Sequence, residues 1–180
     1  MKVRRSTFTF SVLCSERVPP SLQANSEFMV NRAKFRKWIH LFEGVTSIMF
    51  FASLSDYDEP GASSRSPRTR LIESLNLFEA IVNSHWFLRT SIILFWTGID
   101  EFRTKLHEVP LVEYFPEYMG GTDADEGARC IRVRFLEVNR ARLPVYSHIA
   151  DVSNMLGIRL VVAAVRDTVF RNTLRTLDLL

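Results

Sequence analysis

Two stretches decide the fold of this 180-residue chain: Val45-Thr46-Ser47-Ile48-Met49-Phe50-Phe51-Ala52 and Ser91-Ile92-Ile93-Leu94-Phe95-Trp96. Both are apolar at successive positions, so a strand formed by either would present apolar side chains on both faces. That pattern is typical of strands buried in a parallel sheet between helices. Residues 145–150 predict a further strand, and residues 7–13 have the β-branched and aromatic composition of another.

Helices are expected between and after these strands. Ser66 and Pro67 are predicted to be the N-cap and the first-turn proline of a helix that begins there. Its apolar positions at helical spacing are Leu71, Leu75, Phe78 and Val82. A helix is expected over 123–141, and the last helix carries an apolar stripe of Ile158, Val161, Val162, Val165 and Val169. The segment 55–65 is expected to be a polar loop. Alternating helices and strands predict an α/β fold with a mostly parallel sheet flanked by helices.

Composition excludes several classes of protein. The net charge is only +3 and the basic residues are scattered, which argues against nucleic-acid binding. No apolar run approaches the roughly 20 residues that span a bilayer, so we expect no transmembrane segment. Cys14 and Cys130 are far apart and suggest neither a zinc site nor a disulfide framework. A cytoplasmic protein is the expectation.

Several segments, in this order, carry a resemblance to a known family. They are residues 35–45, 53–58, 77–79, 86–87, 91–95 and 116–118. Together they resemble the C-terminal part of the Ras-like domain of heterotrimeric G-protein α subunits. The resemblance covers residues 27–180 and leaves 1–26 as an irregular N-terminal segment. It implies a signal transducer of G-protein-coupled receptors that binds GTP or GDP with Mg²⁺ and hydrolyses GTP.

The nucleotide-contacting positions depart from the family's pattern. The switch II segment of the family has two glycines followed by a catalytic glutamine, and here Met29, Val30 and Asn31 stand at these places. An asparagine side chain is one methylene too short to orient the attacking water in the same way. Asn31 is therefore a degenerate catalytic position, with a helix N-cap as its alternative role.

The base-recognition positions are altered as well. The resemblance places Thr97, Gly98, Ile99 and Asp100 on the family's Asn-Lys-x-Asp motif. Asp100 retains the carboxylate that accepts hydrogen bonds from guanine, while Gly98 lacks the lysine stem that packs along the base. The second base-contacting loop corresponds to 150–153, in which Ser153 is a weak candidate.

The sequence contains no Gly-Lys-Ser/Thr triplet, because none of its four lysines follows a glycine. Backbone amides and a lysine must surround the phosphates in a P-loop. We therefore expect a partial Ras-like P-loop NTPase fold that lacks the P-loop and the helical insertion domain. The family's catalytic arginine and magnesium-binding threonine also precede the matched segment, so whether this chain hydrolyses GTP stays open.

Candidate interface residues lie in two places. Arg36, Lys37, Trp38 and His40 belong to an expected basic amphipathic helix, which in the family contacts the βγ dimer and effectors. Trp86 and Phe87 resemble part of the effector-contact loop, with a packed aromatic pair as the alternative. By resemblance the partners are a βγ dimer, a receptor and an effector, and they would hold the chain at the inner membrane face.

Two functions follow from these observations. The first is a G-protein α-like signal transducer with impaired nucleotide binding and hydrolysis. The alternative is a non-catalytic module that binds a βγ dimer, receptor or effector, or a truncated product without function.

Overall fold

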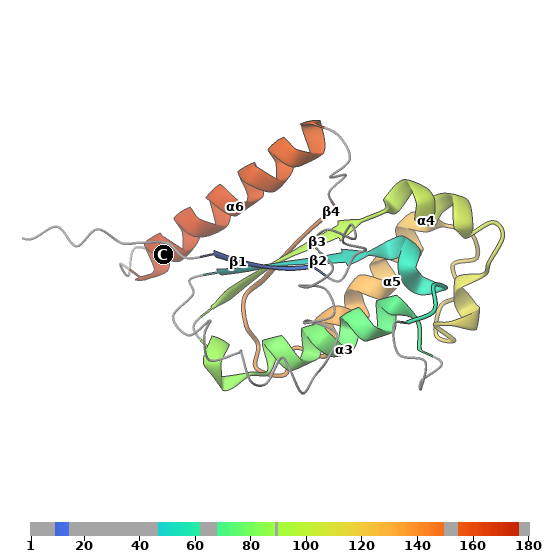
Figure 1. The fold of residues 1–180 in the computed structure, drawn as a ribbon, viewed down its shortest axis with the longest axis horizontal. Helices are drawn as coiled ribbons and strands as arrows, with labels where there is room; N and C mark the ends of the chain where they lie inside the picture. The colour runs from blue at the N-terminus through green and yellow to red at the C-terminus, as the bar shows by residue number, and fades with distance from the viewer. Residues whose placement is uncertain (1–9, 15–46, 62–67, 89, 150–154, 177–180) are drawn as a thin grey trace, which may run out of the picture.

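The computed structural model describes residues 10–14, 47–61, 68–88, 90–149 and 155–176. Its centre is a parallel sheet of four strands in the order β1-β2-β3-β4 (Figure 1). The strands are β1 (Phe10–Cys14), β2 (Ser47–Ser53), β3 (Ser91–Thr97) and β4 (Val145–Ile149). The expected α/β fold with a parallel sheet flanked by helices is thereby confirmed.

One face of the sheet holds the larger core. Helices α3 (Arg70–Val82) and α5 (Ala124–Glu137) cover this face. Phe50 of β2 meets Phe78 of α3 edge-on at 5.2 Å, and Trp96 of β3 meets Phe135 of α5 at 4.8 Å between ring centroids. Edge-to-face pairs at this spacing are the favoured aromatic geometry. Both helices lie on the same side because β–α–β crossovers are almost always right-handed.

The opposite face is covered by α6 (Met155–Thr176), as Figure 1 shows. Ile93 and Phe95 of β3 are buried there against Val161, Ala164 and Val165 of α6. Alternate residues of β3 therefore enter two different cores, which explains why all seven of its residues are buried. No helix in the described ranges is long and apolar enough to cross a membrane.

Short elements connect the sheet to these helices. They are η3 (Leu54–Tyr57), η4 (His85–Phe87), α4 (Ile99–Lys105) and η5 (Leu111–Glu113). Residues 55–65 were expected to form a polar loop, and this expectation was wrong for its first part. Leu54, Ser55 and Tyr57 are buried, because η3 turns directly beneath the end of β2.

Two predicted helix ends and one predicted face also differ. The N-cap of α3 is Thr69 rather than Ser66, because an antiparallel bridge between Pro60 and Thr69 keeps the chain extended up to Arg70. Helix α5 ends at Glu137 rather than at residue 141. Val162 was placed on the inward stripe of α6, but it lies on the outer face and is 62% exposed.

Candidate functional site

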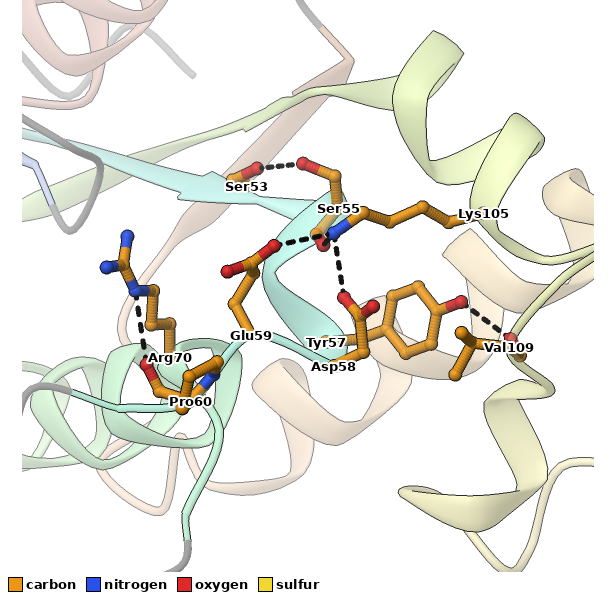
Figure 2. Close-up of polar contacts among 9 residues, drawn as sticks. All are labelled: Ser53, Ser55, Tyr57, Asp58, Glu59, Pro60, Arg70, Lys105 and Val109. Atoms are coloured by element: carbon orange, nitrogen blue, oxygen red, sulfur yellow. Dashed lines mark hydrogen bonds and ion pairs between the residues drawn. The ribbon is translucent and has the colours of Figure 1, made fainter. Parts of the chain in front are cut away.

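Ligands of open parallel sheets bind beyond the carboxyl ends of the strands. Here β2 ends at Ser53 and β3 at Thr97, which are register partners in the sheet. Element η3 follows β2, and α4 follows β3 after Gly98. The candidate site is therefore the edge at which η3 and the start of α4 meet (Figure 2).

Gly98 is tightly enclosed at this edge. Its backbone is left-handed, with φ 68° and ψ 24°, a conformation that glycine adopts without steric penalty. The buried hydroxyls of Ser53 and Ser55 lie 2.9 Å apart in a hydrogen bond. A Cβ added to Gly98 would lie 2.8 Å from Ser55 Oγ and 2.9 Å from Ser53 Oγ. The serine pair thus fills the space that a side chain at position 98 would need.

The two other candidate residues of β3 and α4 have contrasting surroundings. Thr97 is 3% exposed, and its hydroxyl has no hydrogen-bond partner in the described part of the chain. Asp100 lies at the surface with an 81% exposed side chain, where Arg103 Nη1 contacts its Oδ1 at 3.1 Å. An ion pair this exposed contributes only about 0.2–1 kcal/mol, so the Asp100 carboxylate remains accessible to a ligand.

Lys105, at the end of α4, connects α4 to η3 and the residues that follow it. Its Nζ donates to Glu59 Oε1 at 2.8 Å, Asp58 Oδ1 at 2.9 Å and the Ser55 carbonyl at 3.2 Å (Figure 2). Burial alone would lower the pKa of Lys105, but the hydrogen bonds to Glu59 and Asp58 raise it well above its ordinary value. The lysine therefore stays charged and fixes η3, with Ser55, against α4.

Tyr57 is a buried anchor of the site that sequence reasoning missed. Its hydroxyl donates to the Val109 carbonyl at 2.6 Å, and its ring meets Phe102 edge-on at 5.4 Å. Burial in this surrounding raises the pKa of Tyr57 to about 12. The spacing of Leu54 and Tyr57, three residues apart, was the available signal for a buried helical turn.

The remaining candidate residues divide into two groups. One group lies outside the described residues: Asn31, Arg36, Lys37, Trp38, His40 and Ser153. The other is the pair after α3, where Phe87 is 1% exposed and belongs to the larger core. Trp86 is half-buried and lies against His85 at 4.5 Å between ring centroids. The alternatives for this pair were an effector contact and a packed aromatic pair. Phe87 is packed in the core, whereas Trp86 is partly accessible.

The described residues fit a guanine nucleotide poorly. Asp100 offers an acceptor for a base, but position 98 has neither a lysine stem nor the space for one. Within the described ranges, no group of three His, Cys, Asp or Glu side chains could hold a metal ion. At this edge of the sheet the Asp100 carboxylate is therefore exposed, whereas the space beside Gly98 is filled by Ser53 and Ser55.

Comparisons with known proteins identify the family to which the sequence is similar. A profile described as G-protein alpha subunit matches residues 27–169. The chain is 52% identical to a guanine nucleotide-binding protein subunit alpha of Cryptococcus neoformans var. neoformans serotype D. It is 49% identical to the alpha-3 subunit of Ustilago hordei and 45% to the alpha-2 subunit of Saccharomyces cerevisiae. Each comparison covers 144 residues, which are 80% of this chain but 33%, 40% and 32% of these relatives. The chain thus spans about a third of the length of such relatives.

Replacing Gly98 with alanine should destabilise the fold more than the same change at Gly121. Both glycines have positive φ, 68° and 62°, but a Cβ at Gly121 meets no atom within 4 Å. The left-handed backbone costs alanine about 1–2 kcal/mol at either position. Overlap with the serine hydroxyls adds about 1–3 kcal/mol at Gly98 only. Urea denaturation followed by tryptophan fluorescence measures the difference, and equal losses at the two positions would contradict the closed site.

Stability should fall as the pH rises from about 10 to about 12. The folded state holds the Tyr57 proton up to a pKa of about 12, whereas the ordinary pKa is 10.0. The folded chain thus binds more protons than the unfolded chain between these values, and stability decreases there. Thermal melts of the chain and of Tyr57→Phe test this, because the variant should lose stability at pH 7 but show a flatter decline above pH 10. Parallel profiles would rule out Tyr57 as the cause.

Proposed function

Because this chain belongs to the G-protein alpha subunit family, we propose that it acts as a G-protein α-like signalling component whose nucleotide binding and GTP hydrolysis are impaired. The observation that carries the proposal is the closed space beside Gly98. In a base site, the side chain at this position would pack along the ring. Gly98 has no side chain that could pack along the ring. The buried hydroxyls of Ser53 and Ser55 occupy the space where such a side chain would begin.

The sequence that follows β1, at the same edge of the sheet, supports the same proposal. Strand β1 is parallel to β2, so its carboxyl end at Cys14 lies at the same edge as Ser53. The residues that follow it are Ser15-Glu16-Arg17, and no glycine occurs before Gly44. A loop that brings successive backbone amides close to phosphates depends on glycines. The sequence after β1 therefore offers no such cradle, and Asn31 replaces the water-orienting glutamine.

Signalling in this proposal rests on protein contacts. Helices α3 and α5 cover one face of the sheet and α6 covers the other. The basic segment with Arg36, Lys37, Trp38 and His40 has the composition of an interface. We place a βγ dimer, an effector or a receptor on these residues and on Trp86 as partners. Such partners would keep a cytoplasmic chain at the inner face of the membrane.

A titration with a fluorescent GTP analogue in the presence of Mg²⁺ tests the first part of the proposal. No saturable signal is expected up to high micromolar concentration, because one carboxylate is the main contact that remains. Asp100→Asn should give the same result, because a single carboxylate contact is too weak to produce saturable binding. Saturable, Mg²⁺-dependent binding that Asp100→Asn weakens would overturn the proposed impairment.

A pull-down with a purified βγ dimer tests the second part. Trp38→Ala should weaken capture about 30-fold or more, because a tryptophan anchor contributes about 2 kcal/mol or more at an interface. Val133→Ala, at an exposed apolar residue of α5 that belongs to neither candidate interface, serves as the control and should leave capture by βγ unchanged. Failure of the unmodified chain to bind would rule out the βγ dimer as the partner, whatever the nucleotide titration shows.

A further inference from the structure

The outer face of α6 combines arginines with exposed apolar side chains. Residues Arg159, Ala163, Arg166 and Phe170 are spaced by four, three and four positions, so they form one stripe along the helix, with Val162 beside it. All five are exposed, and Val162 and Phe170 are 62% and 61% accessible. Val161, Ala164 and Val165 face the opposite way, onto β3. This stripe with Val162 is called the α6 face below.

The α6 face carries a strong excess of positive charge. The helix holds Arg159, Arg166, Arg171 and Arg175 against a single acid, Asp167. Arg171 already pairs with Asp167 at 2.9 Å. No ion pair of Arg159 or Arg166 occurs in the described part of the chain. A partner for this face should therefore be acidic.

The mixing of charge and apolar groups favours a protein over a lipid surface. A helix that lies on a membrane separates an apolar side from a charged side. Here Arg166 lies between Val162 and Phe170, so a bilayer that buried the two apolar groups would also bury the guanidinium. Arginine interleaved with aromatic and aliphatic groups is instead the composition of protein interfaces.

A segment of complementary charge, with exposed acidic residues, occurs on the same chain. Residues 108–126 contain no Lys or Arg and six acids, namely Glu108, Glu113, Glu117, Asp123, Asp125 and Glu126. Exposed apolar groups lie among them, since Met119 is 94% and Val112 47% accessible. Arg134 and Arg129 neutralise Glu117 and Glu126, while the other four acids make no ion pair in the described ranges. These residues are called the acidic face below.

The two faces lie in different parts of the molecule. Helix α6 covers one face of the sheet, whereas the connection between α4 and α5 lies beyond the carboxyl ends of β2 and β3 (Figure 1). One chain therefore cannot join its own two faces. Two α6 faces would bring arginines together, so a symmetric pairing through α6 is disfavoured.

We propose that the α6 face of one chain docks onto the acidic face of a second copy. This contact is head-to-tail, so it leaves one free face of each kind and can extend beyond a dimer. Exposed ion pairs each contribute little to binding, so the association should be weak and sensitive to salt. The Debye length falls from about 10 Å at 0.1 M salt to about 3 Å at 1 M, which screens such pairs.

Sedimentation velocity of the full chain over a concentration series tests the proposal. At low salt the weight-average mass should rise above the 20.8 kDa of one chain, and it should return to that value near 1 M salt. Arg159→Glu/Arg166→Glu and Glu113→Arg/Asp125→Arg should each remain monomeric. Arg68→Glu, an exposed charge reversal before α3, should associate like the unmodified chain. Circular dichroism verifies that all four proteins are folded.

Mixing the two double variants is the decisive measurement. The first retains its acidic face and the second its α6 face, so the original pair of faces can form again in an equimolar mixture. The weight-average mass of the mixture should therefore rise above that of either variant alone. A mixture that stays monomeric, or a monomeric unmodified chain at low salt, would overturn the proposal. Sedimentation with vesicles containing phosphatidylserine is run in parallel. Vesicle binding that Arg159→Glu/Arg166→Glu abolishes, without self-association, would assign the α6 face to membranes instead.

Discussion

The burial of β3 on both faces is the constraint on which the rest of the structure depends. All seven of its residues are withdrawn from water, and alternate side chains enter separate cores. One core is large and aromatic, with Phe78 and Phe135 beneath the sheet. The other is small and rests on one helix. A strand of this kind is stable only while both covers are in place.

The sequence predicted those parts of the fold that local patterns determine. Strands β2 and β3 were predicted from continuous apolar runs, because a strand buried on both faces needs apolar side chains at successive positions. The N-cap at Thr69 did not, because it depends on a bridge to Pro60, nine residues earlier. Tyr57 was missed for a similar reason: its hydroxyl is satisfied by the Val109 carbonyl, 52 residues along the chain.

In the candidate site, too, some residues could be recognised from the sequence, whereas contacts between residues far apart in the chain could not. The resemblance to the G-protein α family selected Thr97, Gly98 and Asp100. The closure of the site by Ser53 and Ser55 was not predictable, because it depends on the register that pairs Ser53 with Thr97. The apolar pattern of the strands could therefore be read from the sequence, whereas the contacts between polar residues at the edge of the sheet could not.

The left-handed backbone at Gly98 has an evolutionary consequence. Any other residue at this position must enter a disfavoured conformation and displace two hydrogen-bonded hydroxyls. A single replacement of Gly98 would therefore lower stability before the new side chain could contact a ligand. Replacement of the serines would have to come first. The order of mutations, rather than their number, thus limits whether a side chain can be introduced at position 98.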